Sequence, residues 1–285
     1  MKISGSTPLY ALLGSPVSHS LSPLLQNGWI NEHGFDAVYV GLAIASDYFE
    51  SALEGLFHAG LQGANVTTPF KERAKAACMT CSPDALKAGS VNCLFRALGE
   101  NATGFSGTST DGAGFLADLD ARANGWRERS GHVVILGAGG AARSMLYAMS
   151  SAGIDGIHLV NRNLSRARDT AATIEGAKVH IHSWADIEAS LRGASLVINA
   201  TSAGFGGLDP LQPDFSVTTA DCLVYDSVYA PRETAFLRAA KQHKRQALDG
   251  LGMLVGQGAL AFETWFGVRP DIKAGLLRLE ASLGS

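Results

Sequence analysis

A loop that contains three serines and a histidine follows the first apolar segment of the chain. Residues 9–13 predict a short buried strand, after which the chain reads Ser18-His19-Ser20-Leu21-Ser22. Hydroxyl groups at the end of a strand can bind a carboxylate through hydrogen bonds. The alternative is structural, because Ser22 is a suitable helix cap and Pro23 suits the first helical position. The spacing alone leaves both interpretations open.

A second group of polar residues surrounds Pro69. Asn65, Thr67 and Lys71 lie where an expected strand runs into an expected helix. A lysine at a helix start is slightly unfavourable by itself, because the helix dipole is positive there. Lys71 is therefore a candidate for chemistry, with a solvated lysine as the alternative. Asp111 also starts an expected helix, where an acid is favoured, but it lies at an expected domain boundary, where a cleft would be.

A glycine-rich turn predicts where a cofactor binds. An apolar run at residues 132–136 leads into Gly137-Ala138-Gly139-Gly140-Ala141-Ala142 and a segment of good helix formers. This strand, turn and helix place a diphosphate at the helix N-terminus, where free N–H groups and the dipole favour an anion. Gly137 allows the tight turn, Gly139 lets the backbone approach the phosphates, and Ala142 permits close helix–strand packing. The alternative is an ordinary strand–helix connection.

The next strand end distinguishes between two nicotinamide cofactors. Residues 157–160 predict a strand, and an NAD site usually carries an acid at its end to hold the ribose 2′-hydroxyl. Here the chain reads Asn161-Arg162-Asn163-Leu164-Ser165-Arg166, without an acid. Arginine suits a 2′-phosphate through charge-assisted, planar contacts. The sequence therefore favours NADP, with solvated helix-start arginines as the alternative.

Strands and helices alternate along the chain and predict an α/β protein of two domains. An α/β substrate domain is expected at residues 1–107. A doubly wound Rossmann-type NADP-binding domain is expected at residues 108–247, followed by C-terminal helices at residues 248–285. The small polar residues around Thr201 end a buried strand, where they would face the ligand crevice of an open sheet. Further strands are expected at residues 38–42, 88–95, 179–182 and 223–226, and helices at residues 47–59 and 272–283.

Composition limits the classes of function. The 285 residues are 46% hydrophobic and 17% charged, with a net charge of −3. Nucleic-acid binding would need a basic face, and no apolar run approaches the length of a membrane span. No signal peptide is expected. We expect a cytoplasmic protein that binds a small molecule, as a monomer or homodimer.

The cysteines and histidines suggest no metal site. Cys78 and Cys81 form a C-x-x-C pair, but no second pair completes a zinc site. Free thiols in a reducing compartment are the favoured interpretation, and a redox pair is the alternative. His180 and His182 share one face of an expected strand and are expected to be exposed to solvent.

Five motifs in order together resemble the shikimate dehydrogenase family. They span nearly the whole chain, and although each is weak alone, five in register are highly specific. The motifs are Ser-His-Ser-Leu-Ser-Pro (18–23), Asn-Val-Thr-Thr-Pro-Phe-Lys (65–71), Ser-Thr-Asp-Gly (109–112), Leu-Gly-Ala-Gly-Gly-Ala-Ala-Arg (136–143) and Gly-Leu-Gly-Met-Leu-Val-Gly-Gln (250–257).

The resemblance implies an enzyme of aromatic amino acid biosynthesis that reduces 3-dehydroshikimate to shikimate with NADPH. Its active site lies between two domains, and the C-terminal helices pack back on the first. Lys71 and Asp111 match the family's catalytic pair. The matches to substrate-binding residues are Ser20, Ser22, Thr67, Asn92, Tyr229 and Gln257. The matches to cofactor-binding residues are Gly137, Ala138, Gly139, Gly140, Ala141, Asn161, Arg162, Arg166, Thr201, Ser227 and Gly250.

Three positions depart from the family pattern. Cys93 and Ser109 stand where the family usually has Thr and Asn, and Ser227 stands at the position of a methionine beside the nicotinamide. These changes put the substrate in doubt, because the family also includes enzymes that act on quinate and on amino analogues. Other hypotheses are a non-catalytic NADP-binding sensor and a zinc- or thiol-dependent enzyme built on Cys78 and Cys81. The intact Lys71 and Asp111 argue against a sensor, which needs no proton donor.

Overall fold

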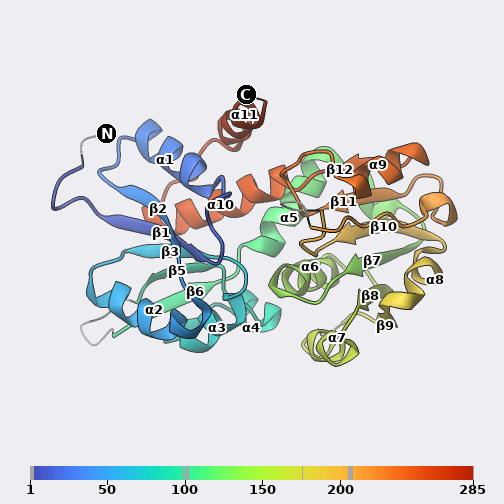
Figure 1. Cartoon of the computed structure of the whole chain (residues 1–285), viewed down its shortest axis with the longest axis horizontal. Coiled ribbons are helices and arrows are strands. Elements are labelled where there is room, and N and C mark those ends of the chain that lie inside the picture. Colours follow the sequence, from blue (N-terminus) through green and yellow to red (C-terminus); the bar gives the residue numbers. More distant parts are fainter. Residues whose placement is uncertain (1–2, 98, 100–102, 175, 205–207, 285) are drawn as a thin grey trace. The chain divides into compact units, whose positions relative to one another are not determined.

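The computed structural model describes residues 3–97, 99, 103–174, 176–204 and 208–284. The chain divides into two compact units (Figure 1). Unit 1 comprises Met1–Thr110 together with Val255–Ser285, and unit 2 comprises Asp111–Leu254. Unit 1 is therefore built from two separate stretches of chain, whereas unit 2 is continuous.

Unit 1 contains one mixed sheet and helices from both of its stretches. Its strands are β1 (Leu9–Gly14), β2 (Val38–Ala43), β3 (Gly63–Val66), β4 (Thr80–Cys81), β5 (Cys93–Arg96) and β6 (Phe105–Thr108). Its helices are α1 (Ser22–Glu32), α2 (Phe49–His58), α3 (Lys71–Ala77), α4 (Pro83–Ala88) and α11 (Ile272–Leu283), together with most of α10 (Leu251–Phe266).

The sheet of unit 1 has the order β2-β1-β3-β5-β6-β4. β1 pairs in parallel with β2 and β3, whereas β5 is antiparallel to β3 and β6. Helices α2, α3 and α4 cover one face through a core that includes Leu13, Phe49 and Phe70. On the C-terminal side, Trp265 of α10 donates a hydrogen bond from Nε1 to the Leu94 carbonyl (2.9 Å). The C-terminal helices thus complete unit 1, as expected.

Unit 2 is a parallel sheet with helices on both faces. Its strands are β7 (His132–Leu136), β8 (Ile157–Asn161), β9 (Val179–Ser183), β10 (Ala194–Asn199), β11 (Leu223–Asp226) and β12 (Gln246–Leu248). Its helices are α5 (Asp111–Arg122), α6 (Gly140–Ser151), α7 (Leu164–Ala171), α8 (Ile187–Leu191) and α9 (Ala235–Gln242).

The strand order β12-β11-β10-β7-β8-β9 is the doubly wound order of dinucleotide-binding folds. Each strand pairs in parallel with its neighbours. α5 and α6 pack on one face through residues such as Phe115 and Met145, and α8 and α9 cover the other through Leu191 and Phe236. This topology confirms the predicted α/β class and the Rossmann-type sheet.

Two local predictions in unit 1 are wrong. Ser22 is not the cap of α1, because the helix begins at Ser22 itself and Leu21 occupies the cap position without a side-chain bond. The strand expected at residues 88–95 is shorter, because α4 continues to Ala88 and ends at Gly89 in the left-handed conformation (φ 67°). β5 begins only at Cys93, so Asn92 lies in the loop before it.

None of the helices in the described parts of the chain has the length and apolar character needed to cross a membrane.

Candidate active site

Ser20 and Ser22 of the N-terminal loop lie together at the start of α1. Ser22 is in the first turn of the helix and is 5% exposed. Its backbone N–H donates a hydrogen bond to Oγ of Ser20 (3.2 Å). A helix N-terminus favours an anion, so this position is compatible with the predicted carboxylate site.

Thr67, which follows β3, lies against the carboxyl end of β1, the strand that precedes the serine loop. Thr67 donates from its backbone N–H to the Leu13 carbonyl (2.9 Å). A Cβ at Gly14 would lie only 2.3 Å from Cγ2 of Thr67, so glycine is needed for this approach. Lys71 is the first residue of α3, and its carbonyl accepts a hydrogen bond from the Val91 backbone N–H (2.9 Å).

Asn92 and Gln257 are joined by a hydrogen bond, although they are far apart in sequence. Nδ2 of Asn92 donates to Oε1 of Gln257 on α10 (3.3 Å). The backbone N–H of Thr110 donates to Oδ1 of Asn92 (2.7 Å). Both amide side chains are buried, with exposed fractions of 2% and 9%. Unit 1 therefore brings together two residues that were predicted to bind one ligand.

The glycine turn of unit 2 is compatible with the predicted diphosphate site. Gly137 has φ 110°, and a Cβ there would lie 2.9 Å from Cγ2 of Thr201. A Cβ at Gly139, the cap residue of α6, would meet no described atom within 4 Å. The chain thus leaves room where the phosphates would approach, and Gly140 and Ala141 open a helix of 12 residues. Ala138 and Ala142 are buried beside the turn.

At the end of β8, both arginines lie beside a capped helix. Oδ1 of Asn163 accepts from the backbone N–H of Arg166 (3.0 Å) and caps α7, while Nδ2 of Asn161 donates to the Asn163 carbonyl (2.8 Å). The guanidinium carbon of Arg162 lies 5.3 Å from the centroid of the Trp184 ring. Both arginine residues are exposed. Cationic groups and an absent acid fit a 2′-phosphate better than a 2′-hydroxyl.

A buried carboxylate that sequence reasoning missed ties β10 and β11 together. Asp226 accepts hydrogen bonds from Nδ2 of Asn199 (2.9 Å), the Val228 N–H (3.0 Å) and the Thr234 hydroxyl (2.6 Å). Burial raises the pKa of Asp226 to about 6. Oδ1 of Asn199 in turn accepts from the hydroxyl of Thr201 (2.6 Å). Asp226 therefore organises the strand ends on which the predicted cofactor residues lie.

Ser227 and Tyr229 belong to the loop after β11, in which the Val228 N–H donates to Asp226. The backbone N–H of Ser227 donates to the Asn199 carbonyl (2.9 Å). Gly250 lies against the same loop, because a Cβ there would be 2.3 Å from the Ser227 carbonyl oxygen. The hydroxyl and amide groups at the ends of β10 and β11 were a sequence signal for this site, but the carboxylate of Asp226 was not singled out.

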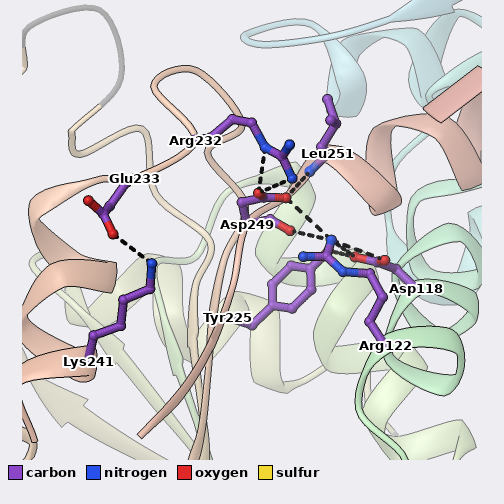
Figure 2. Close-up of polar contacts among 8 residues, drawn as sticks. All are labelled: Asp118, Arg122, Tyr225, Arg232, Glu233, Lys241, Asp249 and Leu251. Atoms are coloured by element: carbon purple, nitrogen blue, oxygen red, sulfur yellow. Dashed lines mark hydrogen bonds and ion pairs between the residues drawn. The ribbon is translucent and has the colours of Figure 1, made fainter. Parts of the chain in front are cut away.

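An ion-pair network holds the residue before Gly250 (Figure 2). The Asp249 carboxylate pairs with Arg122 (3.3 Å) and Arg232 (2.9 Å), and it accepts from the Leu251 N–H (3.2 Å) at the start of α10. Arg122 also pairs with Asp118 (3.3 Å). This network fixes the chain on either side of Gly250 within unit 2.

The two predicted catalytic residues belong to different units. Lys71 lies in unit 1, and Asp111, which is 4% exposed, is the first residue of α5 in unit 2. Their pairing stays a prediction.

The predicted exposure of His180 and His182 is wrong, because both are half-buried in a cluster of four histidines. His132, His158, His180 and His182 lie on β7, β8 and β9, and the ring of His158 stacks on that of His132 at 4.0 Å. The ring centroids of His180 and His182 lie 4.9 and 4.8 Å from that of His158. Burial and these neighbours lower the pKa of His158 to about 4. Among the described residues, no three His, Cys, Asp or Glu side chains are placed to hold a metal ion.

Cys78 of the C-x-x-C pair has the wrong electrostatics for a nucleophile. Cys78 is half-buried, and burial followed by the neighbouring Cys81 raises its pKa to about 12. A reactive cysteine needs a lowered pKa, because the thiolate is the nucleophile. The raised pKa therefore gives no support to Cys78 as a nucleophile.

Family models match most of the chain. Residues 12–94 match the shikimate dehydrogenase substrate binding domain, and residues 121–205 match shikimate / quinate 5-dehydrogenase. Residues 250–275 match the shikimate 5'-dehydrogenase C-terminal domain.

Known proteins resemble the chain over nearly its whole length. It is 41% identical to a shikimate dehydrogenase (NADP(+)) of Acidiphilium cryptum, with 99% of both chains covered. The shikimate 5-dehydrogenase of Thermus thermophilus in complex with NADP(H) and shikimate has a TM-score of 0.84 at 30% identity, covering 97% of this chain and 100% of that one. A quinate dehydrogenase of Corynebacterium glutamicum in complex with NAD has a TM-score of 0.85 at 26% identity, covering 96% and 99%. The names of these relatives agree with the predicted oxidoreductase class, and the chain belongs to the shikimate dehydrogenase family.

Proposed function

We propose that this chain catalyses the NADP-dependent, reversible reduction of 3-dehydroshikimate to shikimate in the cytoplasm. The observation that carries the proposal is its identity of about 40% with shikimate dehydrogenases (NADP(+)) over 95% or more of both chains. All four cysteines are free thiols, in keeping with a reducing compartment.

We assign the substrate to unit 1, which corresponds broadly to predicted residues 1–107 and 248–285. Ser20 and Ser22 at the start of α1 bind its carboxylate. Thr67, Asn92 and Gln257 bind the ring hydroxyls, and the hydrogen bond between the last two supports their common role. Tyr229, which lies in unit 2, is assigned to the substrate by its match to the family pattern.

We assign NADP to unit 2. The diphosphate binds at the turn from Gly137 to Ala141, where the chain leaves open space beside Gly139. Asn161, Arg162 and Arg166 bind the adenosine phosphate, because they supply donors and positive charge where an NAD site has an acid. Thr201, Ser227 and Gly250, which follow the ends of β10, β11 and β12, are assigned to the nicotinamide side of the cofactor.

Lys71 and Asp111 supply the proton chemistry. The bound nicotinamide supplies a hydride for the substrate carbonyl carbon. The Lys71 ammonium donates a proton to the oxygen, which would otherwise carry the developing negative charge. We assign Asp111 to the same proton transfer, as the second member of the catalytic pair that the family pattern matches. In the reverse direction the lysine accepts the hydroxyl proton.

The first test is the absorbance of NADPH or NADH formed from shikimate and from quinate, each with NADP and with NAD. We expect fast turnover with shikimate and NADP. Turnover of quinate alone would assign the chain to the quinate branch and give Cys93, Ser109 or Ser227 a role in selecting it. NADP binding without turnover of either compound would instead favour a sensor.

A further inference from the structure

A chain of buried hydrogen bonds in unit 1 runs from Tyr39 on β2 to Gln257 on α10. The Tyr39 hydroxyl donates to Oδ1 of Asn65 (2.8 Å), and Nδ2 of Asn65 donates to the Asn92 carbonyl (3.2 Å). The side chain of Asn92 then donates to Gln257 (3.3 Å). Tyr39 and Asn65 are 1% and 4% exposed.

Two backbone groups fix the direction of every bond in this chain. A carbonyl oxygen can only accept, so the Asn65 atom that faces the Asn92 carbonyl must be Nδ2, and Oδ1 must face Tyr39. A backbone N–H can only donate, so the Asn92 atom that faces Thr110 must be Oδ1 (2.7 Å). Nδ2 of Asn92 therefore faces Gln257. The amide orientations, which are otherwise ambiguous, follow from these two anchors.

Tyr39 suits the role of a permanent donor at the start of this series of hydrogen bonds. Burial, followed by the neighbouring Cys93, raises the pKa of Tyr39 well above its ordinary value. Its hydroxyl therefore stays protonated near neutral pH and directs its hydrogen to Asn65. Without that hydroxyl, Oδ1 of Asn65 would be buried with its donor missing, and turning the amide round would set two oxygens against each other at Asn92.

We propose that Tyr39 is a positioning residue, which acts through Asn65 to hold Asn92 and Gln257 in the orientation that binds substrate. The proposal rests on the proposed function, in which Asn92 and Gln257 contact the ring hydroxyls. Tyr39 lies at the opposite end of this series of hydrogen bonds from Gln257.

The test is the variant Tyr39→Phe, which keeps the ring and removes the hydroxyl. We expect its KM for shikimate to rise about 3- to 10-fold, the size of one net hydrogen bond. The KM for NADP should not change, because the cofactor residues lie in unit 2. Tyr10→Phe is a matched control. Tyr10 is the register partner of Tyr39 on β1, and its ring lies 5.2 Å from that of Trp265, which also lies 6.0 Å from the Tyr39 ring.

A double-mutant cycle separates positioning from general loss of structure. If Tyr39 acts through Asn65, Tyr39→Phe should have no further effect on the KM for shikimate in an Asn65→Ala background. An unchanged KM in Tyr39→Phe, an equal rise in Tyr10→Phe, a parallel rise in the KM for NADP, or additive effects in the cycle would each overturn the proposal. Wild-type protein that does not turn over shikimate would instead overturn the proposed function, and the role of Tyr39 in shikimate binding would fall with it.

Discussion

Lys71 shows how a single side chain can be tested apart from its fold. It lies in the first turn of α3, where a cation opposes the helix dipole, so its removal should not weaken the helix. Its backbone bond from Val91 does not depend on the side chain.

We therefore expect Lys71→Ala to lower kcat for shikimate by about 100- to 10,000-fold, the range for loss of a general acid or base. NADP affinity should be almost unchanged. Steady-state kinetics and a fluorescence titration with NADPH measure the two effects. Lys75→Ala, one turn further along α3, is the control and should stay active. Loss of NADP binding in Lys71→Ala would count against the assigned role.

The arginines after β8 allow a second residue-level test, of cofactor choice. Replacing Arg162 and Arg166 with Ala together should weaken NADP relative to NAD by about 10- to 100-fold, because charge-assisted hydrogen bonds to a 2′-phosphate are lost. The ratio of kcat/KM for the two cofactors is the measurement. Arg168→Ala, in the last turn of α7, serves as the control. An unchanged ratio would contradict the 2′-phosphate site.

Among the elements, strands β7, β8 and β9 share the histidine cluster. The pKa of His158 is lowered to about 4 in the folded protein, against an ordinary value of 6.5. The imidazole of His158 therefore binds a proton more tightly in the unfolded chain than in the folded protein. Stability from the neutral ring is complete above pH 6.5 and is lost as the pH falls toward 4.

We expect the wild type to lose more unfolding free energy than His158→Gln as the pH is lowered from about 7.5 to about 4.5. Urea unfolding of both proteins across this range gives the difference. The comparison is needed because Asp226 titrates in the same range with the opposite sign, since its pKa is raised to about 6 and its protonation favours the folded state. Parallel pH profiles for the two proteins would show that His158 carries no such effect.

Elements with a local signal were predictable from the sequence, and those set by distant contacts were not. The final helix was expected at residues 272–283, where α11 lies, because its amphipathic pattern is local. The strand expected at residues 88–95 begins only at Cys93. The reason is that Gly89 ends α4 in a left-handed conformation, which an apolar pattern alone does not reveal. The links from Tyr39 to Asn65 and from Asn92 to Gln257 join different elements, so no spacing rule could have found them.

At the scale of the whole molecule, the C-terminal helices are part of the first unit's core. Trp29 on α1 donates from Nε1 to the Asp271 carbonyl (3.2 Å), just before α11. Gly275 on α11 packs against the same ring, since a Cβ there would lie 2.6 Å from Cζ2 of Trp29. The side chain of Gln26 reaches the Gly258 carbonyl (2.9 Å) on α10.

Gly275→Leu should push α11 away from α1 and destabilise unit 1 by about 1–3 kcal/mol, as overpacking does. Hydrogen exchange read by mass spectrometry should show faster exchange in α1 and α11, with the strands of unit 2 unaffected. The exposed Lys273→Ala on the same helix is the control. Equal acceleration in both units would contradict a local role for this contact.

The discontinuity of unit 1 has a consequence for how the protein is made. Domains generally fold as units, N-terminal ones first, while the ribosome is still elongating the chain. Here synthesis of unit 1 begins before that of unit 2 but is completed after it. Unit 1 needs Val255–Ser285, whereas unit 2 is one continuous stretch of the sequence. The nascent protein would therefore acquire its nucleotide-binding half while the other half still waits for its closing helices. A premature stop codon just after Leu254 would leave unit 2 intact and remove Gln257, and one between residues 267 and 271 would remove only the helix that packs on Trp29.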